Sequence, residues 1–198
     1  MVTTVAVIDR IEICGNIASG KTTLAQACDK VGYKTIFEDF SNVPFLSDFY
    51  NNPAEFAFET ETAFTLFHYY QLKKLGNRFG VSDFSLIDDY AFALTTLSTD
   101  EFIIYEKMFD YIVERIGLPK KVLYLVSSVE TLLKRINKRG RENEQTITAD
   151  YLSAVQKNIQ VTCSKKFATV PFVSIDTSAI TIFEYNMDFI SGLLKEEK

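Results

Sequence analysis

The stretch "GNIASGKTT", residues 15–23, has the residue types and spacing that bind the phosphates of a nucleotide. It fits G-x-x-x-x-G-K-[ST], in which the glycines permit unusual backbone angles and successive N–H groups surround phosphate oxygens. In such a loop Lys21 reaches the terminal phosphates and Thr22 can hold Mg²⁺. The alternative, a glycine-rich turn that binds nothing, is disfavoured because both spacing and context agree. The predicted ATP-binding residues are Gly15, Asn16, Ile17, Ala18, Ser19, Gly20, Lys21, Thr22 and Thr23.

A second group of residues that suits phosphate chemistry lies in "LLKRINKRGRENE". Arg135 and Arg139 are four residues apart on one helical face, and Arg141 follows just beyond Gly140. Guanidinium groups suit a transferring phosphoryl group, whose charge is spread over several oxygens. By itself a basic helix face is more often solvated, or could bind nucleic acid. Together with the phosphate loop, these arginines indicate a cationic lid that closes over the phosphates.

Phosphoryl transfer to a hydroxyl group also needs carboxylates, one near the attacking oxygen and another near the metal. We expect "YKTIFED" to be a strand ending in Glu38-Asp39, and "FSLIDDY" to be the third strand, ending in Asp88-Asp89. In open α/β sheets, ligands bind beyond the carboxyl ends of the strands. We therefore predict that Glu38 acts on the hydroxyl group and that Asp89 serves the metal. The alternative for each is a carboxylate that faces water or caps the next helix.

The segment from Asn52 to Leu75 interleaves phenylalanines with acidic residues. Glu61, Phe64 or Thr65, and His68 fall on one helical stripe, which could line a pocket for a flat base. Periodicity alone favours the plainer alternative, in which the aromatics are core, the acids are solvated and His68 is structural. The acidic run "NNPAEFAFETETAF" offers no cations to hold an acceptor phosphate, so a neutral acceptor such as a nucleoside fits better.

These residues must be positioned by elements that alternate along the chain. Short β-rich runs such as "VAVIDRIEIC", "KVLYLVSS" and "PFVSID" alternate with stretches of helical period, including "VETLLKRINKRG" and "ADYLSAVQKNIQVTCSKK". The alternation predicts an α/β sandwich with a mainly parallel sheet, and we interpret residues 1–198 as a single domain. Ser127, with Glu130 three residues later, fits a capping box at the start of a helix.

Composition narrows the class of protein. With 47% hydrophobic residues the chain of 198 residues can bury a core, and its net charge of −5 disfavours nucleic acid and anionic membranes as partners. Cys14, Cys28 and Cys163 show no paired or metal-ligand spacing, as expected of reduced thiols in a cytosol. Because no apolar run approaches the ~20 residues that span a bilayer, we expect a soluble cytoplasmic protein.

The chain resembles the deoxynucleoside kinase family, particularly its bacterial deoxyguanosine and deoxyadenosine kinase branch. "GNIASGKTT" is similar to the family's phosphate loop, with Ala18 where many members have glycine; "VPFLSDFYNNPAEFAFETE" is similar to the segment that binds sugar and base; and "RINKRGRENEQTITADYL" is similar to the lid. The resemblance implies a P-loop kinase fold of three layers with a five-stranded sheet, an arginine-rich lid, ATP and Mg²⁺ as cofactors, and a homodimer.

The same resemblance implies roles for individual residues. Glu38 matches the glutamate that takes the proton from the nucleoside 5′-hydroxyl, and Tyr50 with Glu144 match the pair at the 3′-hydroxyl. Asp89-Tyr90-Ala91 stands where many members have an acidic residue, arginine and serine, so the duty of that arginine would either fall to Arg141 or be lost. The residues expected to be catalytic are Glu38, Lys21, Arg135, Arg139 and Arg141; those expected to bind substrate are Glu38, Tyr50, Glu61, His68, Asp89, Arg141 and Glu144; and Thr22 and Asp89 are expected to hold the metal.

Base preference depends on Glu61, which occupies the position of a base-binding glutamine, while His68 replaces an arginine near the base. An ionised carboxylate only accepts hydrogen bonds, and guanine offers two adjacent donors, N1–H and the 2-amino group. We therefore expect ATP-dependent phosphorylation of the 5′-hydroxyl of a purine deoxynucleoside in nucleotide salvage, with deoxyguanosine favoured and deoxyadenosine next. The alternatives are a nucleoside monophosphate kinase, and a nucleotide-binding regulatory protein whose catalysis has decayed, with Tyr90 as the main sign.

Overall fold

The computed structural model describes residues 5–39, 45–141, 144–178 and 186–194. Its five strands form one sheet in the order β2-β3-β1-β4-β5, and every neighbouring pair is parallel. The expected mainly parallel five-stranded sheet is confirmed. The strands are β1 (Val7–Gly15), β2 (Thr35–Ile36), β3 (Gly80–Ser82), β4 (Leu118–Val126) and β5 (Phe172–Asp176).

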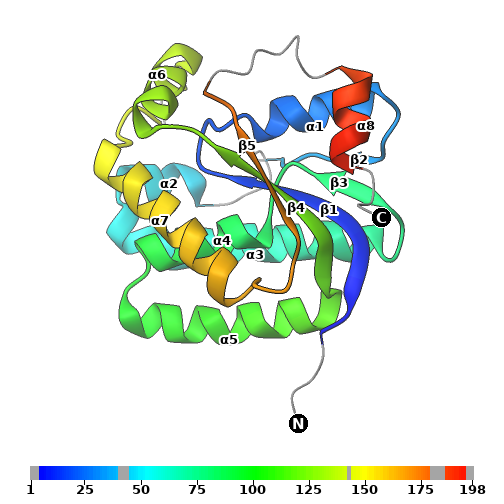
Figure 1. Ribbon diagram of the computed structural model, residues 1–198. Helices are drawn as coiled ribbons and strands as arrows, with labels where there is room; N and C mark the ends of the chain where they lie inside the picture. Colours follow the sequence, from blue (N-terminus) through cyan, green and yellow to red (C-terminus); the bar gives the residue numbers. More distant parts are fainter. Residues whose placement is uncertain (1–4, 40–44, 142–143, 179–185, 195–198) are drawn as a thin grey trace.

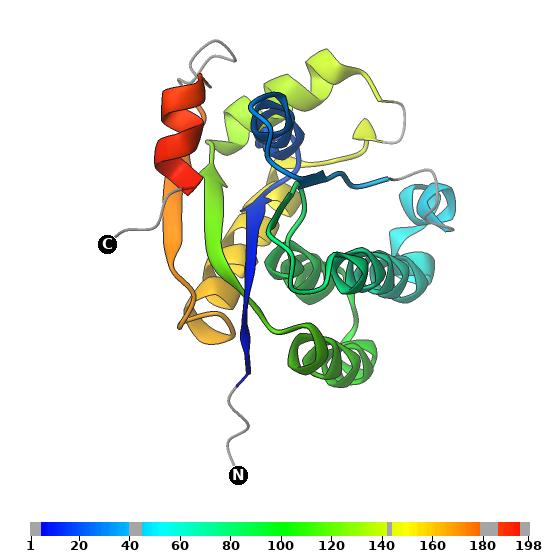
Figure 2. The ribbon, with the colours of Figure 1, turned by 90° about the vertical axis from the view of Figure 1, so that its right-hand side faces the viewer.

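Helices cover both faces of this sheet and complete three layers (Figure 1). Helices α1 and α8 pack on one face, and α3, α4, α5 and α7 pack on the other. Figure 2 shows α3, α4 and α5 nearly end on, on one side of the strands. The helices are α1 (Lys21–Lys30), α2 (Leu46–Asn51), α3 (Pro53–Leu75), α4 (Leu86–Thr96), α5 (Thr99–Ile116), α6 (Val129–Arg139), α7 (Ala149–Lys165) and α8 (Met187–Leu194).

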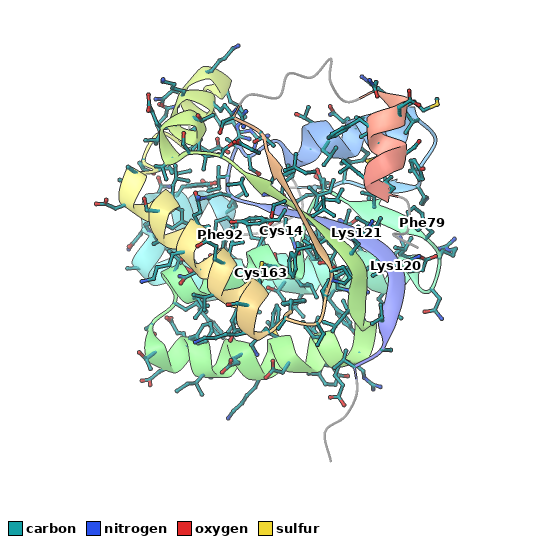
Figure 3. All side chains as sticks on the ribbon, viewed as in Figure 1. Cys14, Phe79, Phe92, Lys120, Lys121 and Cys163 are labelled. Atoms are coloured by element: carbon teal, nitrogen blue, oxygen red, sulfur yellow. The ribbon has the colours of Figure 1, made fainter. Side chains whose placement is uncertain are left out.

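The two faces follow from the alternation of side chains along each strand. Ile11 and Ile13 of β1 join the apolar cluster under α1 and α8, whereas Cys14 joins the cluster on the opposite face. Figure 3 shows the side chains that fill these layers, with Cys14 and Cys163 labelled. Because both faces of β1 are covered, its carboxyl end is held rigidly where the phosphate loop begins.

A buried ion pair ties the start of α4 to the sheet. The Arg10 guanidinium lies 2.8 Å from the Glu12 carboxylate and donates to the backbone oxygens of Ile116 and Gly117. Glu12 in turn accepts from the Ser85 hydroxyl at 2.8 Å and from the backbone N–H of Leu86 at 3.2 Å. A buried charge is tolerated only when it is paired and hydrogen-bonded, and here the partners also fix the entry into α4.

The interpretation of "FSLIDDY" as the third strand is wrong. The strand β3 ends at Ser82, and α4 begins at Leu86, with the Ser85 side chain accepting the N–H of Ile87 at the helix start. Leu86 and Ile87 are fully buried, so the run is as apolar as a buried strand, and periodicity cannot separate a short buried helix from a strand. The carboxylate that follows the strand is therefore Asp83, and Asp88 and Asp89 lie in the first turn of a helix.

The expected capping box of Ser127 and Glu130 is wrong, because the helix begins one residue later and its third position is Thr131, which cannot close the box. Ser128 is the N-cap, and its hydroxyl accepts the backbone N–H of Thr131 at 3.2 Å. Ser127 is buried, and its hydroxyl lies 2.6 Å from that of Thr177. Throughout the described ranges, each helix is too short or too polar to cross a membrane.

Candidate functional site

One cavity lies at the carboxyl ends of the strands, between the phosphate loop, α2, α3, α4 and the segment that joins α6 to α7. It brings together most of the predicted site residues, which come from distant parts of the chain. The predicted residues that line it are Ile17, Ala18, Lys21, Thr22, Glu38, Tyr50, Glu61, His68, Asp89, Arg139, Arg141 and Glu144. The predicted residues that are not part of its lining are Gly15, Asn16, Ser19, Gly20, Thr23 and Arg135.

The backbone of the phosphate loop explains its sequence. Gly15 has a φ of 154°, and a Cβ there would lie 2.7 Å from the Ser19 hydroxyl and 2.8 Å from the Leu125 backbone oxygen. Ala18 has a φ of 59°, in the left-handed region that L-residues other than glycine adopt at a cost of about 1–2 kcal/mol. A glycine would remove that cost, which gives a physical reason for glycine at this position in other phosphate loops.

Two side chains hold the phosphate loop against its surroundings. The Asn16 amide donates to the backbone oxygen of Leu152 at 2.8 Å, which ties the loop to α7. Arg135 donates to the backbone oxygens of Ala18 at 3.3 Å, Ser19 at 3.4 Å and Thr177 at 2.5 Å. The role of Arg135 at the phosphoryl group stays a prediction; in this structure it holds the loop backbone and is not among the residues that line the cavity.

Lys21 lies beside a carboxylate that the sequence analysis did not select. Its ammonium group is 3.5 Å from Asp88 and donates to the backbone oxygen of Gly15 at 2.5 Å, while Asp88 accepts the N–H of Gly15 at 3.0 Å. Burial lowers the pKa of Lys21, but Asp88 and Glu38 raise it by more, so the lysine stays charged. Burial raises the pKa of Asp88 to about 6, although Lys21 opposes that rise. Asp88 therefore holds the lysine beside the loop.

A second missed carboxylate, Asp83, lies beside Thr22. Asp83 accepts the backbone N–H of Glu38 at 2.6 Å, and burial raises its pKa although its hydrogen bond with the Thr22 side chain lowers it. A hydroxyl group and a carboxylate are the hard oxygen ligands that Mg²⁺ takes, together with substrate phosphates. Among the described residues, no three His, Cys, Asp or Glu side chains gather as a cluster that could hold a metal. Thr22 and Asp83 fit a magnesium ion that is bound largely through a nucleotide.

The triplet Asp83-Phe84-Ser85 has the acidic–x–serine order that the sequence analysis assigned to Asp89-Tyr90-Ala91. This triplet follows β3 directly. Asp89-Tyr90-Ala91 does not, because it lies within α4, which begins at Leu86. Phe84 lines the cavity in the middle position of the triplet. The signal that could have located it is the apolar run Phe79–Ser82, which is short but is followed at once by an acidic residue.

Tyr90 points away from the cavity. Its hydroxyl donates to the Glu106 carboxylate on α5, its ring packs 4.8 Å from that of Phe109, and the Lys166 ammonium lies 4.7 Å above it. Tyr90 is therefore a packing residue between α4, α5 and α7, and it gives no sign of decayed catalysis.

His68 connects the two carboxylates that were predicted to act at the acceptor. Its Nε2 lies 3.1 Å from Glu38, its Nδ1 lies 2.9 Å from Asp89, and its ring stacks on Phe84 with centroids 4.0 Å apart. Burial lowers the pKa of His68, but Asp89 and then Glu38 raise it to about 10. The Nε2 of His68 therefore pairs with Glu38 by charge and not through a well-aligned hydrogen bond. Asp89 pairs with this histidine, and burial raises the pKa of Asp89 while His68 lowers it.

Glu61 lies farther along the same wall of the cavity and is only 6% exposed. Its Oε1 accepts the Thr96 hydroxyl at 3.0 Å. Burial raises the pKa of Glu61 to about 8, although that hydrogen bond lowers it. The sequence analysis assumed an ionised carboxylate at this position, whereas burial favours the protonated form of Glu61.

The remaining wall carries Tyr50 and a group of opposite charges. Glu144 is 5% exposed and accepts from Arg139 Nε at 3.0 Å and from Arg141 Nη1 at 3.2 Å. Burial and then the Glu144 carboxylate raise the pKa of Tyr50 to about 12, so its hydroxyl remains a donor. Phe64, which the helical stripe suggested, also lines the cavity, and Phe49, Phe92 and Tyr151 add aromatic surface that the sequence analysis did not assign to the site.

Comparisons with known proteins agree with this arrangement. A family model described as deoxynucleoside kinase matches residues 11–196. The deoxyguanosine kinase of Bacillus subtilis is 30% identical over 187 residues, which cover 91% of this chain and 88% of that protein. The deoxyadenosine/deoxycytidine kinase of the same organism is 28% identical over 152 residues, or 71% of this chain and 70% of that protein.

The fold has solved counterparts. A structure of deoxyadenosine kinase from M. mycoides with bound dATP matches with a TM-score of 0.79 and 23% identity, and the match covers 94% of this chain and 100% of that one. At this identity the likeness shows the fold, which is that of a P-loop kinase with a parallel five-stranded sheet. The arginine-rich lid stays a prediction.

Proposed function

This chain belongs to the deoxynucleoside kinase family and is a phosphotransferase, and we propose that it transfers the γ-phosphoryl group of ATP to the 5′-hydroxyl of a purine deoxynucleoside in nucleotide salvage. The observation that carries this proposal is the single cavity that has the phosphate loop at one end and Glu38, Tyr50 and Glu61 along its walls. We propose deoxyguanosine as the favoured substrate and deoxyadenosine as the next. The match to a deoxyguanosine kinase over most of the chain supports that order.

In the proposed reaction the 5′-oxygen attacks the γ-phosphorus, the bond to the β,γ-bridging oxygen breaks, and ADP leaves. Glu38 takes the proton of the hydroxyl group, and the His68 imidazolium keeps that carboxylate aimed at it. Lys21 and backbone N–H groups of the phosphate loop stabilise the negative charge on the phosphoryl oxygens. Arg139 and Arg141 would add to this stabilisation by moving from Glu144 toward the phosphates.

For the metal we propose Thr22 with Asp83 in place of Asp89. Asp83 is hydrogen-bonded with Thr22, whereas Asp89 is engaged by His68. A magnesium ion at this position would neutralise charge on the β- and γ-phosphates. For the acceptor we propose that Tyr50 and Glu144 bind the 3′-hydroxyl, and that the aromatic side chains Phe64, Phe84 and Phe92 hold the base.

We propose three further features. The chain forms one kinase domain over residues 1–198, since all described strands belong to one sheet. It acts in the cytoplasm, where its free cysteines would stay reduced. It forms a homodimer through α3 and α5, where the exposed apolar side chains Leu66, Tyr70, Ile103, Ile104 and Tyr111 lie.

A substrate panel with purified protein, Mg²⁺ and labelled ATP tests the proposed activity. We expect label on deoxyguanosine and deoxyadenosine and none on deoxyguanosine monophosphate. Transfer to the monophosphate would favour a nucleoside monophosphate kinase, and tight ATP binding without transfer would favour a regulatory protein.

The variant Glu38→Gln tests the proposed base. We expect turnover to fall by at least ~10² while ATP still binds, because the amide cannot accept the proton of the hydroxyl group. Turnover like that of the wild type would remove Glu38 from the mechanism.

A further inference from the structure

Glu61 is a buried carboxyl group that no cation neutralises in the described part of the chain. The ion pairs of these residues do not include it, and its Oε1 accepts from an uncharged partner, the Thr96 hydroxyl, at 3.0 Å. The same side chain lines the cavity among Phe64, Phe92 and Tyr151, where a planar base would fit. Glu61 therefore lies at the acceptor part of the cavity, with one carboxyl oxygen bound by Thr96 of α4. Few groups around it would stabilise a negative charge on its carboxylate.

The titratable groups around Glu61 do not favour its ionised form. From α4, Asp89 raises the pKa of Glu61 beyond the rise that burial causes. Tyr105 of α5 and Tyr151 of α7 are buried phenols. Burial raises the pKa of both, Asp89 adds to the rise for Tyr105, and the Glu61 charge adds to it for both. On α2 the titratable group in the cavity is Tyr50, and the imidazolium of His68 on α3 is held between Glu38 and Asp89.

The two protonation states of a carboxyl group present different patterns to a base. A neutral acid has one donor and one acceptor, as an amide has. It pairs with the 6-amino group and N1 of adenine, or with O6 and N1–H of guanine. A carboxylate has acceptors only, so it pairs with N1–H and the 2-amino group of guanine and repels the bare N1 of adenine.

We propose that Glu61 reads the base of the acceptor in both states: the neutral acid accepts adenine and guanine, and the carboxylate accepts guanine and rejects adenine. The choice between the two purines therefore depends on the proton that Glu61 carries. This proposal rests on the proposed kinase activity and adds to it a base selection that varies with pH.

The ratio of kcat/KM for deoxyguanosine to that for deoxyadenosine tests the proposal, because the ionisations of the shared phosphoryl-transfer step cancel in it. We expect the wild-type ratio to stay constant from about pH 6 to about pH 8, near the pKa of Glu61. Above about pH 8 the ratio should rise, and its slope should approach a tenfold increase per pH unit. In Glu61→Gln, whose amide cannot titrate, the ratio stays constant. A constant ratio in the wild type, or the same rise in the glutamine variant, would overturn the proposal.

A positioning variant separates this role from a structural one. Thr96 lies outside the cavity lining, and its hydrogen bond lowers the pKa of Glu61. Thr96→Val removes that bond, so the rise in the ratio should move to higher pH. A rise that stays at the wild-type pH contradicts the assignment of the titration to Glu61.

Equilibrium binding gives a readout that needs no catalysis. At about pH 8.5, calorimetry in buffers of different ionisation enthalpy should show proton uptake when deoxyadenosine binds the wild type, and none with Glu61→Gln. Absence of this uptake overturns the inference while deoxynucleosides are still phosphorylated. If no deoxynucleoside is phosphorylated at any pH, the proposed function fails instead, and the binding measurement still decides the role of Glu61.

Discussion

Individual side chains in this site are defined by their partners. His68 could have been a core histidine, yet its two ring nitrogens lie beside Glu38 and Asp89, so one residue pairs with both carboxylates. Asp83 and Asp88, which the sequence analysis passed over, contact Thr22 and Lys21, the two loop residues that matter most for phosphates. Roles at this scale depend on contacts between residues far apart in the chain.

A matched pair of variants tests whether Asp83 binds the metal while Asp89 holds His68. Asp83→Asn should raise the Mg²⁺ concentration for half-maximal activity by about tenfold or more, because an amide is a weaker ligand for a hard cation than a carboxylate. Asp89→Asn should lower kcat by releasing His68, with the Mg²⁺ requirement unchanged. Rates measured as a function of free Mg²⁺ concentration distinguish the two carboxylates. If only the Asp89 variant needs more Mg²⁺, the assignment of Asp89 to the metal is correct.

The burial of Glu61 also predicts a change in stability with pH. Its pKa is about 8 in the folded state, against 4.5 as the ordinary value, so the folded state keeps a proton that the unfolded state loses. The free energy of unfolding should therefore fall as pH rises from about 4.5 to about 8. Relative to the wild type, Glu61→Gln should gain up to about 4 kcal/mol over that range.

Urea unfolding at about pH 5 and about pH 8 measures this gain. Glu59→Gln, on the exposed side of α3, controls for the removal of a carboxylate from the same helix. An equal gain in both variants would show that burial of Glu61 is not the cause.

At the scale of elements, the phosphate loop is held by its neighbours as well as by its own sequence. Ile17 and Ala18 pack against Leu132 and Ile136 of α6 and Leu152 of α7. Arg135 of α6 adds hydrogen bonds to the loop backbone and to Thr177, beyond the end of β5. Helix α6 therefore shapes the donor site even where its side chains are not part of the cavity lining.

Arg135→Lys tests this bracing role. A lysine keeps the charge but loses the planar fork that reaches two segments at once, and a hydrogen bond from a charged group contributes about 1.5–3 kcal/mol. We expect a lower melting temperature and a KM for ATP raised at least about fivefold, with the KM for the deoxynucleoside unchanged. Lys134→Ala, which removes an exposed cation paired with Glu130 on the same helix, is the control. A selective loss of kcat would instead indicate direct contact with the phosphoryl group.

On the scale of the whole molecule, the proposed dimer predicts at which positions a new charge would prevent dimer formation. The side chains of Leu66 on α3 and Ile104 on α5 are exposed, and the two helices lie side by side on one face (Figure 2). Leu66→Glu or Ile104→Glu should produce monomers at low micromolar concentration in sedimentation, because a buried unpaired charge is costly. Met187→Glu, on α8 across the sheet, should keep the wild-type mass. Monomeric wild-type protein would end the dimer proposal.

The sequence by itself determined the donor loop, the alternation of strands and helices, the mainly parallel sheet and the family. The loop, the alternation and the sheet follow from local spacing and periodicity, which a single chain displays directly, and the family follows from the resemblance of its motifs. Only the tertiary structure decided that Leu86 begins a helix, that Asp83 follows β3 and contacts Thr22, that Tyr90 packs away from the cavity, and that Arg135 holds the loop backbone. It also showed that burial raises the pKa of Glu61 and that Asp89 and Glu38 raise the pKa of His68. The physical reason is that burial and the distance between charges are set by residues far apart in the chain.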